Sequence, residues 1–500
     1  MRRLFFTLGF AAIPALLMSA CNGNAGGAGL TPQANASHRV GHPLDNSAAD
    51  IHAGGADFPA YAYNLGDQPV GLYTSAQPTP GPGSILYEAA KNNADGNNYY
   101  YCLSSSGYGK NEFDANDEQV GTGACAAIGQ TRTGFGGRTD PVDFVGTDVG
   151  LASNECCASG SAYANSPYAA TYGQPFQMPT FGGPIVFPYI NDGTHGLTGL
   201  GSNRLKLSTW TYCAIANGTI GRWNDPAITA DNGGTPVAGN QAITFVYRSD
   251  TSGTTYLFET KLNDSLKGCN QTFKGKYAKA PYTGTGRSAA WPYGIPSPSN
   301  SLWSGPTGAQ TSGSTFVGAN GNPAVIETIQ GYAGSGYPYA TGYALGAWAA
   351  AASNPPVQQA ALLSGSTFVS PTDAGADVQA LAKATASKLQ YGVGSDGNSL
   401  GSSTPTCQFY IAPSVFVDPP AGAYPIVGLS YFLFYGKDQT RAGSNHYTDL
   451  KNLIAFIDSE TVNAELPNLE YSPLPASTQK KIQQAAFGKG IKGTGACFRQ

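Results

Sequence analysis

Short apolar runs of strand length alternate along this chain with segments of helical periodicity, and this alternation constrains the fold more than any other feature of the sequence. The runs predicted to form strands are 143–147, 184–190, 242–248 and 425–435. The segments with helical spacing of apolar residues are 208–216, 254–263, 323–330, 448–459 and 476–486. Strands that alternate with helices are typical of an α/β fold with open sheets. We therefore expect open sheets flanked by helices.

The composition permits a buried core and excludes several classes of protein. Gly and Pro make up 66 and 34 of the 500 residues, and 41% of residues are hydrophobic. This share of Gly and Pro is below the roughly 25–30% of disordered chains. A net charge of −4 without a basic run argues against a nucleic-acid partner. Beyond the N-terminal segment no apolar run approaches the roughly 20 residues that span a bilayer, which argues against a polytopic membrane protein.

Three long stretches rich in Gly, Ser, Pro and Tyr interrupt the alternation, at about 61–100, 278–321 and 360–408. We expect them to be surface insertions on a conventional core, which would account for the length of the chain. The whole is then expected to form two lobes rather than three or four domains.

The N-terminus has the features of an export signal. Residues 1–20 contain two arginines, then an apolar run and small residues before Cys21. The ending LMSAC resembles a bacterial lipobox, whose cysteine becomes the lipidated first residue. We predict a signal peptide over 1–20, a lipid anchor on Cys21 and a flexible tether over 21–50. Cleavage without lipidation and a buried N-terminal helix are the alternatives.

The remaining cysteines are an even number in an exported chain and predict disulfides. They are Cys102, Cys125, Cys156, Cys157, Cys213, Cys269, Cys407 and Cys497. Eight cysteines allow 105 pairings, and for the adjacent pair we favour two separate partners over a bridge to each other. No Cys-x-x-Cys occurs and the five histidines have no ligand spacing, so no metal site is expected.

The turn between the predicted strand 242–248 and the helix that follows can bind an oxyanion. It carries Arg248, Ser252, Gly253 and Thr254. The first N–H groups of a helix have no partners within the helix, and the helix dipole places partial positive charge there. Hydroxyls, backbone N–H groups and a guanidinium then form an anion site. The alternative is an ordinary helix cap with Arg248 paired to Asp250.

Two other stretches place polar side chains after predicted strands. Ser105 and Ser106 follow an aromatic run in 99–110, and Asp148 follows the strand 143–147. Ligands of open α/β folds bind at the carboxyl ends of strands. Helix capping and salt bridging are the alternatives for these residues.

Motifs of catalysis and cofactor binding are absent or stand in the wrong context. Residues 397–401 fit G-x-S-x-G without a preceding strand, and 488–493 fit G-x-G-x-x-G after a helix. No H-E-x-x-H and no P-loop occurs. We expect neither catalytic residues nor a cofactor.

Six segments, in the same order, resemble the periplasmic phosphate-binding proteins that serve Pst-type ABC transporters. The sequence RSDTSGT over Arg248–Thr254 is similar to their R-x-D-x-S-G-T phosphate loop, and DFVGTDVGL over Asp143–Leu151 to their D-F-x-x-S-D-x-x-L segment. The other resembling segments are Ala53–Ala60, Ser105–Gly107, Leu207–Ile228 and Tyr424–Tyr435.

The resemblance implies an α/β, two-lobed periplasmic-binding-protein fold of type II. Each lobe would be an open mixed sheet flanked by helices, with phosphate bound in the cleft between the lobes. The first lobe would comprise 51–183 and 341–500, with a Gly/Ser-rich insertion at about 360–408. The second lobe would comprise 184–340.

The resemblance also implies a role for each residue of the phosphate loop. Arg248 would be the only cation on the phosphate, and Asp250 would orient it. Ser252, Gly253 and Thr254 would donate hydroxyl and backbone N–H groups from the start of a helix.

The first lobe would supply the other contacts. Ser105, or alternatively Ser106, would donate a hydroxyl, and Phe58 its backbone N–H. Asp148 would accept the proton that phosphate retains near neutral pH and that sulfate lacks. Asp57 departs from the family, which usually has a threonine donor there. Either Asp57 turns away from the site, or the ligand is more protonated or different, because two acids in one site raise a pKa.

The function that this resemblance implies is capture of inorganic phosphate for an ABC permease of the inner membrane, by a lipid-anchored protein of the periplasm or cell surface. Two alternatives remain open. One is a secreted phosphate-ester hydrolase on the same scaffold, and the other is a surface or matrix protein that has lost ligand binding.

Overall fold

The computed structural model of the protein describes most of the chain from residue 50 onward. The described residues are 50–66, 80–94, 96–115, 142–166, 169–334, 339–373, 375–401, 407–437, 440–441, 444–488 and 495–499. The predicted signal peptide, the predicted anchor Cys21 and nearly all of the predicted tether lie outside these residues. Among the helices that are described, none combines the length and the apolar character needed to cross a bilayer.

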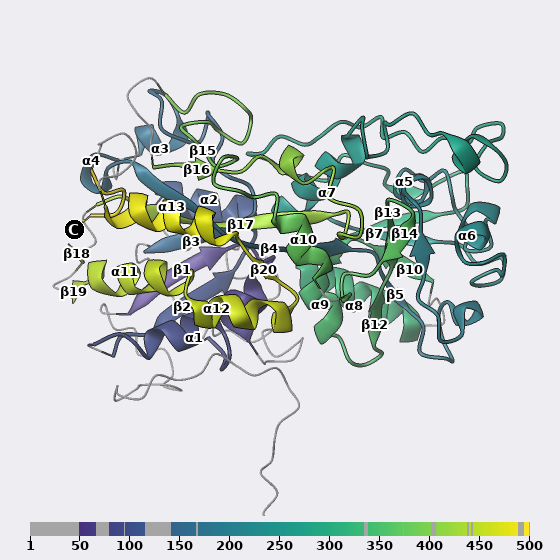
Figure 1. The fold of residues 1–500 in the computed structure, drawn as a ribbon, viewed down its shortest axis with the longest axis horizontal. Coiled ribbons are helices and arrows are strands. Elements are labelled where there is room, and N and C mark those ends of the chain that lie inside the picture. Colours follow the sequence, from purple (N-terminus) through teal and green to yellow (C-terminus); the bar gives the residue numbers. More distant parts are fainter. Residues whose placement is uncertain are drawn as a thin grey trace, which may run out of the picture.

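A seven-stranded mixed sheet forms the core of the first lobe, on the left of Figure 1. Its strands, in spatial order, are β11 (Ala344–Leu345), β4 (Pro175–Val186), β17 (Val427–Tyr435), β3 (Phe144–Thr147), β1 (Ile51–Gly55) and β2 (Tyr99–Leu103), with β20 (Ser472–Pro473) paired to β4. β1 runs parallel to β2 and β3, whereas β17 runs antiparallel to β3 and β4. The helices of this lobe are α1 (Ile85–Ala90), α2 (Ser106–Ala115), α3 (Ala162–Asn165), α4 (Ala169–Tyr172), α11 (Tyr447–Phe456), α12 (Glu460–Glu465) and α13 (Ala476–Phe487).

A four-stranded sheet forms the core of the second lobe, on the right of Figure 1. Its strands, in spatial order, are β10 (Ala340–Gly342), β7 (Thr244–Arg248), β9 (Thr315–Ala319) and β8 (Gly308–Ala309). The helices of this lobe are α5 (Thr209–Ala216), α6 (Pro226–Asp231), α7 (Gly253–Asn263) and α8 (Gly321–Gly334), while α9 (Gly346–Ala351) follows β11 and contacts β4 of the first sheet. β10 ends at Gly342 in this sheet and β11 begins at Ala344 in the other, so the chain passes between the two sheets at Tyr343.

Shorter elements complete the two lobes. Small sheets pair β5 (Pro188–Ile190) with β12 (Val357–Gln359), β13 (Ala361–Ser364) with β6 (Lys206–Leu207) and β14 (Thr367–Val369), β15 (Gln390–Tyr391) with β16 (Phe409–Tyr410), and β18 (Thr440–Arg441) with β19 (Ser444–Asn445). Short helical turns are η1 (Tyr61–Leu65), η3 (Thr198–Leu200), η4 (Gly275–Ala278), η5 (Pro413–Val415), η6 (Leu466–Leu469) and α10 (Ala376–Leu381).

The predicted fold class is confirmed, and the strands and helices expected from periodicity are present to within a few residues, with one exception. The predicted strand 184–190 covers the end of β4, which begins at Pro175, and all of β5, which belongs to another sheet. The expectation that the three Gly-rich stretches are surface insertions is wrong in part. The first contains η1, α1 and the beginning of β2, whose residues pack in the core of the first lobe. The second buries Trp291, which is 2% exposed, and the third buries Leu362 and Leu381. These segments contain few aliphatic residues, so the sequence does not identify them as part of the core. Their tyrosine and tryptophan side chains provide the apolar surface that is buried instead.

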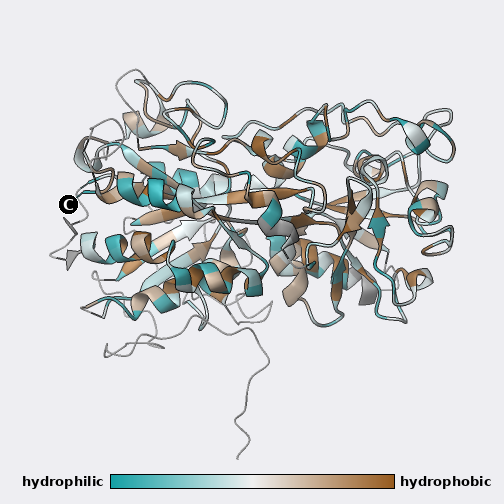
Figure 2. Cartoon of the chain, in the orientation of Figure 1, coloured by the Kyte–Doolittle hydropathy of each residue, from teal (hydrophilic) through white to brown (hydrophobic). Residues whose placement is uncertain are grey.

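The core of both lobes is rich in aromatic residues. Tyr63 stacks on Phe432, with ring centroids 4.3 Å apart, at the centre of the first lobe. In the second lobe Trp303 stacks on Tyr247 and Tyr343. Figure 2 shows hydrophobic residues along the central strands and hydrophilic residues on the outward sides of α12 and α13. The two sheets therefore provide rigid frames whose strand ends can position a site.

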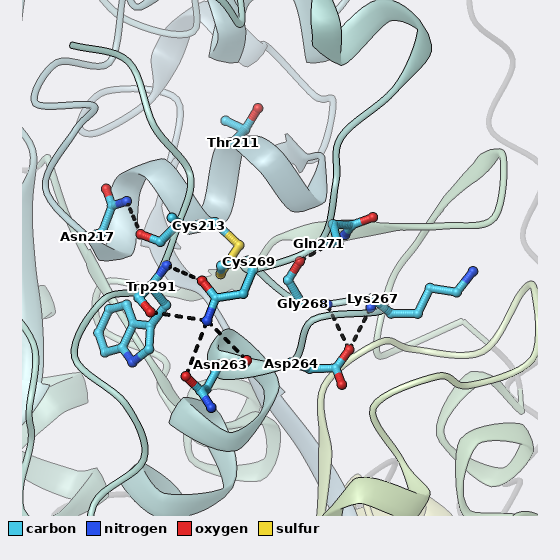
Figure 3. Close-up of a disulfide and its surroundings, with 12 residues drawn as sticks. Thr211, Cys213, Asn217, Asn263, Asp264, Lys267, Gly268, Cys269, Gln271 and Trp291 are labelled. Carbon is cyan, nitrogen blue, oxygen red and sulfur yellow. Dashed lines mark hydrogen bonds between the residues drawn. A yellow bond between two sulfur atoms is a disulfide. The ribbon is translucent and has the colours of Figure 1, made fainter.

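Disulfides are present, as predicted. Figure 3 shows the bridge between Cys213 of α5 and Cys269, which lies in the loop after α7. In that loop Asp264 Oδ1 accepts from the N–H groups of Lys267 and Gly268, at 2.6 and 3.1 Å. The bridge therefore fixes the loop beyond the C-terminal end of α7.

Two more disulfides are described, and Cys102 is also disulfide-bonded. They join Cys407 to Cys497 and Cys156 to Cys157. The expectation of separate partners for the adjacent cysteines is thus wrong, because Cys156 and Cys157 are bonded to each other.

Candidate functional site

The turn between β7 and α7 presents Arg248 at the carboxyl edge of the second sheet. Ser252 caps the helix, since its Oγ accepts from the N–H of Thr255 at 3.2 Å. Arg248 ends β7 and is fully buried. This is the strand–turn–helix arrangement that the sequence predicts for these residues.

Arg248 is held by two carboxylates. Its Nε and Nη2 donate to the two oxygens of Asp250, at 2.7 and 2.5 Å. Its Nη1 lies 3.2 Å from Asp57 Oδ1, but the angle does not make a hydrogen bond, so Nη1 has no hydrogen-bond partner among the described residues. Burial opposes the charge of the guanidinium, yet Asp250 and Asp57 hold the pKa of Arg248 above its usual range. The result is a permanent cation with one nitrogen, Nη1, that makes no hydrogen bond to the described residues.

Asp57 faces this cluster rather than turning away from it. Its Oδ2 accepts from the backbone N–H of Asn322 at 2.5 Å, and its carbonyl accepts from Trp348 Nε1 at 2.8 Å. Burial raises the pKa of Asp57, Arg248 opposes that shift, and the charge of Asp250 adds to it. The neighbouring Phe58 is buried, and its carbonyl accepts from the hydroxyl of Tyr471 at 2.7 Å.

Asp148 and the serines approach from the first lobe. Ser106 Oγ donates to Asp148 Oδ2 at 3.0 Å and accepts from the N–H of Asp148 at 3.1 Å. The other carboxyl oxygen, Oδ1, is buried without a hydrogen-bond partner among the described residues. Burial raises the pKa of Asp148 well above its usual range, the charge of Asp57 adds to this, and the hydroxyl of Ser106 opposes it.

The two lobes touch at this cluster. Ser105 Oγ lies 3.3 Å from Thr251 Oγ1, and the N–H of Gly107 donates to the Thr251 carbonyl at 3.2 Å. A Cβ atom on Gly253 would lie 2.5 Å from Ser106 Oγ and 2.7 Å from Asp148 Cβ. Only a glycine allows the start of α7 to approach the first lobe this closely.

Every predicted site residue of the phosphate loop and of the first lobe therefore lies in one buried cluster between the lobes. Thr254, at the start of α7, is also buried, with Oγ1 3.5 Å from Asn322 Nδ2. The cluster joins one guanidinium, three carboxyl groups, hydroxyls and the N-terminus of a helix. Such a set can bind an anion that also carries a proton, because it offers both donors and an acceptor.

Two residues of the cluster were missed by sequence reasoning. Asn322, at the start of α8, donates its N–H to Asp57 and accepts at Oδ1 from the N–H of Leu345 at 3.0 Å. The hydroxyl of Tyr343 accepts from the N–H of Arg248 at 3.2 Å and lies 2.7 Å from Thr255 Oγ1. The sequence over 315–330 has the pattern of a strand, a turn and a helix, and this pattern could have indicated that Asn322 lies at a helix start near the site. No feature of the sequence indicates that Tyr343 belongs to the cluster.

The other features examined in the sequence lie elsewhere. Ser399, within the G-x-S-x-G match, is exposed in a loop, and most of the G-x-G-x-x-G match lies outside the described residues. Where the structure describes the chain, no group of three or more His, Cys, Asp or Glu side chains is placed to hold a metal ion.

Known proteins share both sequence and fold with this chain. Alkaline phosphatase L of Pseudomonas aeruginosa is 30% identical over 250 residues, which are 49% of this chain and 54% of that protein. Phosphate-binding protein PstS 3 of Mycobacterium leprae is 34% identical over 153 residues, 30% of this chain and 37% of that protein. The matches thus span about half, or less, of the length of these relatives.

The fold is that of a solved phosphate-binding protein. The structure of a high affinity periplasmic phosphate-binding protein (PfluDING) bound with phosphate matches with a TM-score of 0.54 at 21% identity, over 90% of this chain and 99% of that one. The family model of the PBP superfamily domain matches residues 80–461, well over half of the sequence. The chain therefore belongs to the PBP superfamily.

Proposed function

We propose that this chain captures inorganic phosphate between its two lobes and delivers it to an ABC permease. The observation that carries this proposal concerns two buried atoms of the interlobe cluster that have no hydrogen-bond partner among the described residues. They are the donor Arg248 Nη1, whose nearest charge is Asp57 at 3.2 Å, and the acceptor Asp148 Oδ1. Buried polar groups without partners are rare, and each one left unsatisfied is unfavourable. Hydrogen phosphate satisfies both, because it has oxygens for the guanidinium and one P–OH for the carboxylate.

The other residues of the cluster have complementary roles in this proposal. Asp250 orients the guanidinium through its two hydrogen bonds. The start of α7 contributes hydroxyl and N–H donors, as helix N-termini do for phosphates. The remaining donors are Phe58, Ser105, Ser252, Gly253 and Thr254, while Ser106, the alternative to Ser105, donates its hydroxyl to Asp148.

The wider assignment rests on the same proposal. Residues 51–183 and 341–500 would form the phosphate-binding lobe that carries Asp148, and 184–340 the lobe that carries Arg248. The protein would be exported, with Cys21 as its lipid anchor. The relatives named phosphate-binding proteins support a transport role, and we infer that the chain binds its ligand without transforming it.

Hydrolysis of phosphate esters is the second candidate, since one relative is named alkaline phosphatase L. Ser106 Oγ is hydrogen-bonded to a carboxyl group, as a serine nucleophile is to its base. Other relatives, among them PstS 3 of Mycobacterium leprae and PstS 2 of Mycobacterium tuberculosis, are named phosphate-binding proteins. This favours binding over hydrolysis.

Calorimetric titration of the purified protein with phosphate, arsenate and sulfate tests the proposal. Phosphate and arsenate should bind with similar affinity, and sulfate much more weakly because it has no proton for Asp148. Folded protein that gives no binding heat with phosphate would disprove the proposal. Release of chromophore from an aryl phosphate, abolished by Ser106→Ala, would favour the hydrolase.

A further inference from the structure

Asp57 gives the cluster more negative charge than its cation can balance. One guanidinium, Arg248, faces three carboxyl groups, of Asp57, Asp148 and Asp250, and all four side chains are buried. The remaining titratable groups that face Asp57 are the hydroxyls of Tyr101 and Tyr471, and the pKa of each is raised well above its usual range by burial. No neighbouring group in the described cluster therefore supplies a second positive charge.

The incoming anion competes directly with Asp57 for the guanidinium. Asp250 accepts from Nε and from one N–H of Nη2, so the guanidinium nitrogen without a hydrogen bond among the described residues is Nη1, which is also the atom 3.2 Å from Asp57 Oδ1. When a ligand oxygen accepts a hydrogen bond from Nη1, this nitrogen no longer balances the charge of Asp57. The negatively charged ligand also comes to lie next to the carboxylate of Asp57. Both changes favour the neutral form of the carboxyl.

We propose that Asp57 couples anion capture to the uptake of one proton, so that the closed site holds phosphate with this carboxyl neutral. The inference rests on the proposed function. The proton comes from solvent on binding and returns to solvent on release, and no bond of the ligand is broken. The geometry also indicates where it resides: Oδ2 already accepts from the N–H of Asn322, so the proton binds Oδ1. The O–H formed there is a donor on the side that faces Arg248.

Proton counting tests this coupling. Titration with inorganic phosphate in two buffers of different ionisation enthalpy, at about pH 8.5, gives the protons taken up per ligand, since free phosphate is then mostly the dianion and its own titration adds the same amount for every variant. The wild type should take up about one proton more than Asp57→Asn, which keeps an acceptor for the N–H of Asn322. The association constant of the wild type for phosphate should therefore fall more steeply with rising pH than that of Asp57→Asn. The ratio of the two constants should change by about tenfold per pH unit.

Two further variants make the result decisive. Asp57→Thr removes the same charge with a different side chain, so a folding defect in one variant leaves the other informative. Asp458→Asn is the matched control: burial raises the pKa of Asp458 to about 7, but its Oδ2 accepts from Gln483 at 2.6 Å, outside the cluster. It should take up protons like the wild type.

Equal proton uptake by the wild type and both Asp57 variants, with phosphate bound in each, would overturn the coupling and leave the proposed function standing. Phosphate binding by none of them, at any pH, would instead overturn the proposed function, and the coupling with it.

Discussion

Ser106 and Asp148 exchange two hydrogen bonds, one from the serine hydroxyl to the carboxylate at 3.0 Å and one from the aspartate N–H to the hydroxyl at 3.1 Å. This pair fixes the start of α2 against the residue that follows β3. Because it uses Oδ2, it leaves Oδ1 as the one oxygen of Asp148 that can meet a ligand. The acceptor of the proposed phosphate site is thus oriented before any ligand arrives.

Arg248→Ala should weaken phosphate binding by at least about 2–3 kcal/mol, because charge-assisted hydrogen bonds to a desolvated anion are strong. Calorimetry measures the change. Arg287→Ala is the control, since Arg287 makes a comparable pair with Asp225 at 2.9 and 3.0 Å within the second lobe. A wild-type affinity in folded Arg248→Ala would contradict the proposed site.

Asp148→Asn should reduce the preference for phosphate over sulfate. The amide can donate to a fully ionised oxygen, whereas the carboxylate repels one. A hydrogen bond to a charged group contributes about 1.5–3 kcal/mol, roughly ten- to hundredfold in affinity. Competition titrations with both anions measure the ratio, and an unchanged ratio would remove Asp148 from the selectivity mechanism.

Glu259→Gln should stabilise the protein above neutral pH. Burial raises the pKa of Glu259 from 4.5 to about 7, although Ser304 hydrogen-bonds the carboxylate. The folded state therefore binds this proton more tightly than the unfolded state, and the stability it gives is lost as pH rises from about 4.5 through 7. The variant avoids that loss, so its advantage should grow over this range to at most about 3 kcal/mol.

Chemical denaturation of both proteins at several pH values checks this prediction. Near pH 4, where the carboxyl is protonated in both states, the two proteins should be equally stable. An advantage that did not change with pH would mean that the substitution acts through packing instead.

Cys213→Ser combined with Cys269→Ser should lower the melting temperature while phosphate affinity is kept. The bridge closes a loop with a sequence separation of 56, and such a bridge contributes about 2–4 kcal/mol. It lies beyond the C-terminal end of α7, whereas the proposed site uses the opposite end of that helix. Thermal unfolding and calorimetry give the two readouts. A loss of affinity in the folded variant would show that the two ends are coupled.

The sequence was most informative where a strand, a turn and a helix follow one another within a few residues. Arg248, Ser252 and Gly253 belong to one such turn, so their proximity follows from local geometry. Asn322 and Tyr343 join the same cluster through the arrangement of whole elements, which no local pattern encodes. Their contacts depend on how α8, and the segment that passes from β10 to β11 between the two sheets, pack against the turn that carries Arg248.

The orientation of Asp57 illustrates the same limit. From the sequence it could face the cluster or turn away from it, because a turn after β1 permits both. The start of α8 decides between these two orientations, because the N–H of Asn322 donates a hydrogen bond to the carboxylate of Asp57. That helix begins more than 260 residues later, at a position set by the second sheet.

A lysine spans the two lobes some way from the anion site. Lys110 of α2, only 2% exposed, donates to Glu155 Oε2 at 3.0 Å in its own lobe and to the carbonyl of Pro298 at 2.8 Å in the other. Release of a ligand under the proposed function requires the lobes to separate, and the ion pair would then stay intact within the first lobe while only the carbonyl contact is exchanged for water. Opening would therefore leave Lys110 with its counter-charge.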